Sequence, residues 1–183
     1  MSDSRTRLLR LVETAVMIGL AVALSEVKLF KMPYGGSVTA GSMIPLLLVA
    51  LRYGAPWGML AGALAGLANY LIDPYFVHPA QVLLDYPLAF GALGLAGLAS
   101  GKSDALAAWA GSLALGGRML MHVISGVVFF AEYAPEGQHP LVYSVLYNGA
   151  YMIPELIISG ALLMFLLPAL RRALPTGIRA QNS

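Results

Sequence analysis

The chain has 183 residues, of which 58% are hydrophobic and only 11% are charged. A soluble globular domain carries about 25% charged residues, so this composition excludes an ordinary water-facing surface. The net charge of +2 is spread over chain ends and loops, which excludes a basic stripe for nucleic acid, and the lack of cysteine excludes disulfides and thiolate metal sites.

Long apolar segments predict helices that cross a membrane, for which about 20 residues are needed. In chain order these segments are residues 9–27, 39–53, 55–72, 79–99, 104–131 and 141–170. The second is short, so we expect it to be tilted little, extended by its glycine-containing loop, or partly re-entrant. We predict an all-α integral membrane protein of six transmembrane helices, forming a single domain over residues 1–183 with a short polar C-terminal tail over 173–183.

The basic residues indicate how these helices are oriented, because loops rich in Lys and Arg stay in the cytoplasm. If the chain crosses the membrane six times, one side of the membrane contains Arg5, Arg7, Arg10, Arg52, Lys102, Arg171, Arg172 and Arg179. The other side receives only Lys28 and Lys31. We therefore predict that both termini are cytoplasmic in a multi-pass protein of the plasma membrane.

The loop after the first span, residues 31–41, contains Tyr34 and paired glycines. It is expected to be either a mobile flap with Tyr34 as a plug or an ordinary tight turn. Within the first span, Ala15, Gly19 and Ala23 recur every four residues and form a face on which another helix can pack closely. That face serves either internal packing or the docking of a partner protein.

The fourth span carries Asp85 next to Tyr86, a little over one turn from the outer edge. An ionisable side chain at membrane depth is costly and points to a function. Asp85 either faces an outward cavity that suits a cationic or amide-bearing ligand, or forms an ion pair with Arg118 that only joins two helices. The preceding outer loop, residues 73–79, is rigid and aromatic and includes Tyr75.

The fifth span places Arg118, His122, Gly126 and Phe130 four residues apart. A step of four residues advances an α-helix by about 400°, so these side chains share one face that drifts slowly. Gly126 leaves a gap where a ligand or another backbone can approach closely. We predict that this face lines a cavity.

The sixth span contains two overlapping polar stripes, Tyr143, Tyr147 and Tyr151 in one and Ser144, Asn148, Tyr151 and Glu155 in the other. Tyr143 belongs either to an aromatic belt at the lipid headgroups or to a binding site. The amide of Asn148 needs partners in a dry environment, which favours a site.

No sequence motif indicates an enzyme. The chain lacks a Walker A motif, an HExxH motif and a plausible Ser/His/Asp set, and its histidines are scattered. We therefore expect no ATP hydrolysis, no catalytic residue, no metal and no cofactor in this chain.

Several stretches resemble the thiamine-specific S components of energy-coupling factor (ECF) transporters, over about residues 8–172. They are MPYGGS (32–37) with MIP (43–45), LDYPLAF (84–90), RMLMHVISG (118–126), and YNG (147–149) with PE (154–155). The resemblance implies a prokaryotic six-helix vitamin-binding subunit. It would work with a transmembrane T component and two ATP-binding cassette ATPase subunits, and would hold thiamine near the outer face, under the loop that joins the first two helices.

The resemblance also implies roles for individual residues. Asp85 matches the binding acid, Phe130 and Tyr34 match aromatic positions where Trp can occur, and Ala15 with Gly19 match the docking motif, in which a second Ala is more usual. The full candidate set for thiamine is Tyr34, Tyr75, Asp85, Tyr86, Arg118, His122, Gly126, Phe130, Tyr143 and Asn148.

Other functions remain open from the residues alone. They are an S component for another vitamin such as riboflavin, a self-sufficient secondary transporter that uses Asp85 or Glu155 as a proton relay, and a purely structural membrane protein. An aromatic stripe beside a buried acid favours a flat, cationic ligand, and thiamine is such a molecule.

Overall fold

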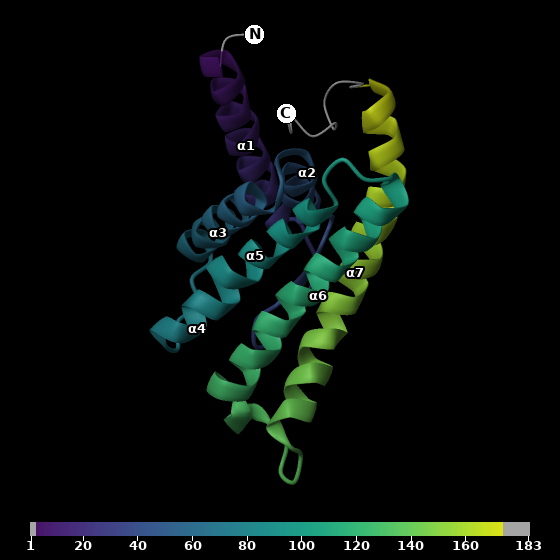
Figure 1. Ribbon diagram of the computed structural model, residues 1–183. Helices are drawn as coiled ribbons and strands as arrows, with labels where there is room; N and C mark the ends of the chain where they lie inside the picture. Colours follow the sequence, from purple (N-terminus) through teal and green to yellow (C-terminus); the bar gives the residue numbers. More distant parts are fainter. Residues whose placement is uncertain (1–2, 174–183) are drawn as a thin grey trace.

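The computed structural model describes residues 3–173 and is built almost entirely of helices (Figure 1). In chain order the elements are α1 (Asp3–Ser25), β1 (Lys28–Lys31), β2 (Ser37–Thr39), α2 (Ile44–Tyr53), α3 (Ala55–Ile72), α4 (Pro79–Leu83), η1 (Leu84–Leu88), α5 (Ala89–Ala92), η2 (Leu93–Ala99), α6 (Asp104–Phe129), η3 (Ala131–Tyr133) and α7 (Pro140–Ala173). Residues 174–183, nearly all of the predicted polar tail, lie outside the described range.

Five helical segments are long and apolar enough to cross a membrane: Ser4–Ser25, Ala55–Ile72, Pro79–Ala99, Asp104–Phe129 and Pro140–Leu170. The helix α2 is apolar but has only 10 residues. The predicted all-helical membrane fold is confirmed at this level, while the number of crossings and the side of the termini stay predictions.

The helices run alternately up and down, so the start of α1 and the end of α7 lie at one end of the bundle (Figure 1). We call this the terminal end. Strands β1 and β2 pair antiparallel as a hairpin, and the hairpin tip contacts the α6–α7 connection through Tyr34 and Tyr133, whose ring centroids are 5.0 Å apart. We call this opposite end the hairpin end.

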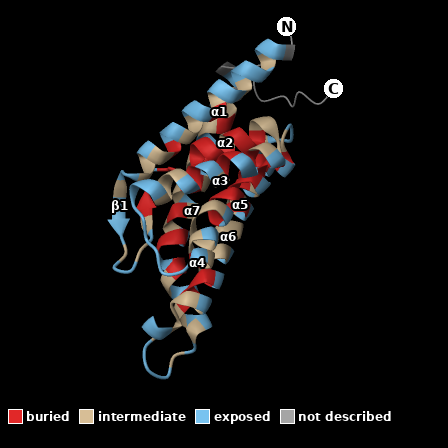
Figure 2. Ribbon diagram, turned by 90° about the vertical axis from the view of Figure 1, so that its left-hand side faces the viewer, coloured by how far each residue is buried: buried red, intermediate tan, exposed pale blue. Residues whose placement is uncertain are grey.

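The hydrophobic core surrounds α2, which explains why this helix need not have the length of a full span. Leu46, Leu47 and Leu51 of α2 are fully buried, together with Leu115 of α6 and Leu163 of α7. Figure 2 shows the buried residues concentrated in this central layer, whereas α1 is largely exposed. Because protein surrounds α2, its ends can satisfy their polar groups inside the bundle.

Helix α3 approaches the fourth span backbone to backbone through Gly58, Gly62 and Gly66. A Cβ atom added at Gly62 would overlap the backbone carbonyl of Phe90, and one added at Gly66 would lie 2.5 Å from the carbonyl oxygen of Tyr86. Small residues spaced by four permit such close approach of membrane helices. This contact holds η1 in place, and the repeat of glycine at 58, 62 and 66 is its signal in the sequence.

Helix α1 is attached to the bundle mainly at the terminal end. Arg52 binds the Glu13 carboxylate through Nε at 3.0 Å and Nη2 at 3.1 Å, and Trp57 donates to Thr14 at 2.8 Å. Ala15 and Gly19 instead face outward, and no atom lies within 4 Å of a Cβ built on Gly19. Ala15 and Gly19 therefore do not serve internal packing within the described part of the chain, whereas Ala21 of the same helix is buried in the core.

Candidate functional site

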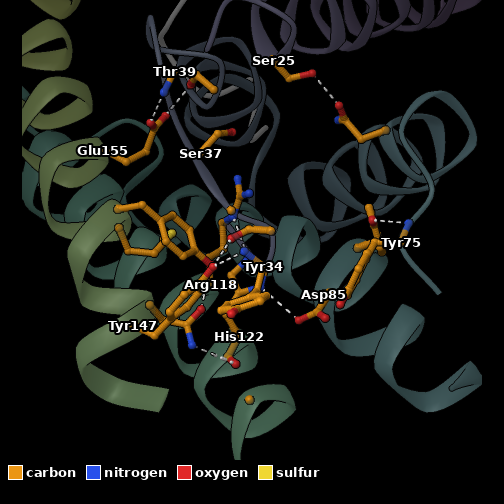
Figure 3. A pocket seen from close by; sticks show the side chains of 18 of the residues that line it. Ser25, Tyr34, Ser37, Thr39, Tyr75, Asp85, Arg118, His122, Tyr147 and Glu155 are labelled. Atoms are coloured by element: carbon orange, nitrogen blue, oxygen red, sulfur yellow. Dashed lines mark hydrogen bonds and ion pairs between the residues drawn. The ribbon is translucent and has the colours of Figure 1, made fainter. Parts of the chain in front are cut away.

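A cavity of about 210 Å³ lies at the hairpin end, between the hairpin, the fourth span, α6 and α7 (Figure 3). All ten candidate residues line it: Tyr34, Tyr75, Asp85, Tyr86, Arg118, His122, Gly126, Phe130, Tyr143 and Asn148. The structure thus brings together residues that are more than 100 positions apart in the sequence. Their part in binding stays a prediction.

Asp85 is held in one orientation by three side chains. Its Oδ2 atom accepts from Gln81 Nε2 at 2.8 Å and from Ser125 Oγ at 2.9 Å, and its Oδ1 atom lies 3.0 Å from His122 Nδ1. Gln81 and Ser125 are almost completely buried. Hydrogen bonds to an ionised acceptor are about twice as strong as neutral ones, so this set stabilises a carboxylate.

Arg118 does not pair directly with Asp85, so of the two alternatives for Asp85 the direct ion pair that joins two helices is wrong. Instead Arg118 Nε donates to His122 Nε2 at 3.3 Å, and the guanidinium lies over the Phe90 ring, 4.0 Å from its centroid, and contacts the Met43 sulfur. His122 therefore stands between the two charges. It joins them without bringing them into contact.

The geometry around Asp85 depends on a short π-helix, η1. The backbone N–H of Ala89 donates to the carbonyl of Leu84, which is the wide turn of a π-helix, and Pro87 lies inside it. Proline cannot donate within an α-helix and its ring clashes with the preceding turn, and one widened turn relieves this clash. Such π-bulges are frequent at functional sites. Asp85 is the second residue of the turn.

Aromatic rings form the outer walls of the cavity. Tyr75 stacks on Phe130 with centroids 5.9 Å apart, and Tyr143 lies 5.7 Å from Tyr147. Tyr86 accepts from the Tyr75 backbone N–H at 3.1 Å, so it fixes the loop that follows α3. Since Tyr143 lines the cavity, the structure does not place it solely in a lipid-facing belt.

Helix α7 is positioned against α6 by small polar groups. Ser144 Oγ donates to the Val123 carbonyl at 2.9 Å, and Asn148 Nδ2 donates to the His122 carbonyl at 3.4 Å. A Cβ atom on Gly126 would overlap the Ser144 hydroxyl. The gap predicted at Gly126 is thus needed for α7 to approach, although Gly126 also lines the cavity.

The β1–β2 hairpin covers the cavity and is tied to α7. Tyr147 donates its hydroxyl to the Gly35 carbonyl at 3.0 Å and accepts from the Tyr34 N–H at 2.8 Å. Gly36, with φ of 86°, presses on the Tyr151 ring, where a Cβ atom would lie 2.5 Å from Cε1. A side chain at this position would therefore lift the hairpin from α7.

The other side of the hairpin is tied to the end of α3 by an exposed ion pair. Lys28 Nζ lies 3.0 Å from Asp73 Oδ2, and the Asp73 side chain is 57% exposed. The hydrogen bond from Lys28 lowers the pKa of Asp73, and Asp73 in turn raises the pKa of Lys28, so both groups are charged near neutral pH. Salt screens exposed pairs of this kind, which makes this the weaker attachment.

Three residues of the site were not predicted from the sequence: Gln81, Ser125 and Tyr133. Tyr147 and Glu155 belong to the predicted polar stripes of the sixth span but were not in the candidate set for thiamine. Gln81 lies one helical turn before Asp85, and Ser125 lies three residues after His122, so helical spacing from the chosen residues would have found both.

Within residues 3–173, no three His, Asp or Glu side chains lie close enough to hold a metal ion.

The arrangement defines a class of protein: a helical membrane protein with a polar cavity between its helices, of a kind suited to a small ligand. Residues 11–174 match the family model described as thiamine transporter protein (Thia_YuaJ). The chain therefore belongs to this family of transporters.

Individual relatives agree with this membership. The thiamine transporter ThiT of Bacillus subtilis is 40% identical over 178 residues, which cover 87% of this chain and 91% of that protein. ThiT of Lacticaseibacillus paracasei is 30% identical over 167 residues, or 78% of this chain and 79% of that protein. A solved structure of ThiT from Listeria monocytogenes has a TM-score of 0.80 at 27% identity and covers 91% of this chain and 97% of that chain. The family resemblance inferred from the motifs is confirmed.

Proposed function

We propose that this chain is the thiamine-binding S component of a bacterial ECF transporter and that thiamine occupies the cavity at the hairpin end. The observation that carries the proposal is the Asp85 carboxylate, oriented by three donors inside an aromatic-walled cavity. Thiamine has a permanent positive charge, two flat rings and an aminopyrimidine with donor groups. A fixed carboxylate suits the charge or the donors, and the rings of Phe130 and Tyr34 suit stacking.

In this proposal the chain crosses the plasma membrane six times and both termini are cytoplasmic. The terminal end then faces the cytoplasm, consistent with Arg5, Arg7, Arg10, Arg52 and Lys102, which lie in the loops and helix ends there. The hairpin end faces outward, so the cavity receives thiamine from outside the cell. Energy would come from a T component and two ATPase subunits, since the chain carries no Walker A motif.

The first prediction is that the purified chain binds thiamine but does not accumulate it. Mass spectrometry should identify thiamine carried through purification, and calorimetry should give one site per chain. Proteoliposomes that contain only this chain should show no uphill uptake, with or without a pH gradient. Accumulation driven by a pH gradient would instead establish a self-sufficient secondary transporter, and binding of riboflavin but not thiamine would establish a different S component.

The second prediction concerns docking of the T component on the outward face of α1 that contains Ala15 and Gly19. Gly19→Trp should abolish uptake by the assembled transporter and its copurification with the T component, because a bulky side chain prevents close helix approach. Thiamine affinity of the isolated chain should change by less than about threefold, since no protein atom lies near this position.

The matched control is Gly116→Trp on α6, because a Cβ atom at Gly116 also meets nothing within 4 Å. This variant should retain assembly and uptake. If Gly19→Trp lowers thiamine affinity in the isolated chain, or if both variants lose uptake equally, the α1 face is not the specific docking surface.

A further inference from the structure

The ionisable groups of the cavity separate into an outer and an inner set. The outer set consists of Glu26, Lys28 and Asp73, which line the cavity, and of Lys31, which does not line it but lies 3.8 Å from Asp73. Lys28 lies 3.6 Å from Glu26. The two positive and two negative charges of the outer set cancel. The inner set consists of Asp85, Arg118, His122 and Glu155 and lies at the depth of the membrane-spanning helices.

The hydrogen bonds of His122 fix its charge. Its Nε2 atom accepts a hydrogen bond from Arg118, and its Nδ1 atom faces the carboxylate of Asp85. An imidazolium has donors on both nitrogens and could not accept from Arg118, so His122 is neutral with its proton on Nδ1. The inner set therefore has only Arg118 to balance its carboxylates.

Glu155 is the second of these carboxylates and is only 2% exposed. Its two oxygens accept from the backbone N–H and the hydroxyl of Thr39, each at 2.7 Å, as Figure 3 shows. Thr39 ends the hairpin, so these bonds also tie the hairpin to α7.

The inner set thus carries two negative charges and one positive charge, a net charge of −1. A net charge at membrane depth is unfavourable unless a counter-charge or water compensates it. No side chain of the described inner cavity supplies that counter-charge. A ligand with a single positive charge would make the inner cavity neutral.

We propose that Glu155 is a specificity-determining residue that, with Asp85 and Arg118, matches the inner cavity to a ligand of charge +1. This inference rests on the proposed placement of thiamine in this cavity and adds a residue that selects by charge. Each oxygen of Glu155 already accepts one hydrogen bond from Thr39, so the role proposed for Glu155 is that of its charge. A neutral molecule of the same shape would leave the inner cavity with an uncompensated charge.

The test compares thiamine with a neutral isostere in which a thiophene ring replaces the thiazolium. Calorimetry gives a Kd for each ligand, and the ratio of the Kd of the isostere to that of thiamine measures selection for charge. The unsubstituted chain should bind thiamine more tightly than it binds the neutral isostere. Glu155→Gln keeps one acceptor and one donor for Thr39 but removes the charge, and should reduce the ratio at least about tenfold, equivalent to about 1.4 kcal/mol.

Thr39→Val is the matched control, because it removes the hydroxyl partner of Glu155 but keeps the charge. Both Kd values should change by the same factor, so the ratio should stay within about threefold. Arg118→Met, measured at about pH 8 where an ordinary imidazole is almost wholly neutral, leaves both carboxylates unbalanced and should raise the ratio. This opposite effect tests the proposal even if Glu155→Gln does not fold.

Two results would overturn the inference. If Glu155→Gln changes both Kd values equally, Glu155 only anchors the hairpin. If Arg118→Met leaves the ratio unchanged or lowers it, the net charge of the inner set does not select the ligand. Failure of the unsubstituted chain to bind thiamine at all is a separate result that refutes the proposed function together with this inference.

Discussion

Asp85→Asn is expected to weaken thiamine binding by at least about tenfold while the protein still folds. A charge-assisted hydrogen bond contributes about 1.5–3 kcal/mol, and asparagine has neither the charge nor a second acceptor oxygen. One of the three donors around Asp85 would then face the amide NH₂ group. Stability should fall little, because Arg118 does not depend on Asp85 as a direct partner.

Calorimetry with thiamine and a thermal melt without ligand, on one preparation, measure both quantities. Asp104→Asn is the control, since it makes the same chemical change at the start of α6, at the terminal end. Its thiamine affinity should match that of the unsubstituted chain. An unchanged Kd combined with a markedly lower melting temperature in Asp85→Asn would assign Asp85 a purely structural role.

Gly66→Ala is expected to lower both stability and thiamine affinity. The added methyl group would lie 2.5 Å from the Tyr86 carbonyl oxygen and 2.7 Å from its carbon, so the backbone of η1 must move. Overpacking of this kind costs about 1–3 kcal/mol. Because Asp85 is the neighbour of Tyr86 in the π-helix, the same movement should disturb the carboxylate.

Gly116→Ala provides the comparison for this variant. A methyl group at Gly116 meets nothing within 4 Å, so the substitution should keep or raise stability, as alanine is the better helix former. Thermal melts and thiamine titrations of both variants give the result. Equal melting temperatures would mean that α3 and the fourth span adapt to the added volume.

Much of the helical framework could be predicted from the sequence. The segments 55–72 and 79–99 have the same limits in the structure, because Gly54 and Pro79 mark the ends of apolar runs. The hairpin was expected only as a flap or turn, since its strands have four and three residues and show no alternating pattern. In the structure this segment is a paired antiparallel hairpin that covers the cavity.

The candidate site was predictable where its residues repeat along one helix. The face of α6 that contains Arg118 and His122 follows directly from the spacing of four. The contact between Glu155 and Thr39 joins positions 116 apart, so no local pattern could indicate it. The support of Asp85 by Ser125 is different, since serine alone carries no specific signal but Ser125 lies three residues after His122 on the same helix, so its spacing indicates it.

The π-helix has a consequence for insertions and deletions in the fourth span. Its wide turn accommodates one residue more than an α-helix would, and each α-helical residue corresponds to a rotation of about 100°. Deleting one residue from Leu84–Leu88 would therefore allow a continuous α-helix in which Pro79–Leu83 and Ala89–Ala99 keep nearly the same relative rotation. A deletion within Ala89–Ala99 would instead rotate everything before it by that angle, so that Gln81 and Asp85 would turn away from the cavity. The register of this span, as much as the identity of its residues, defines the binding chemistry.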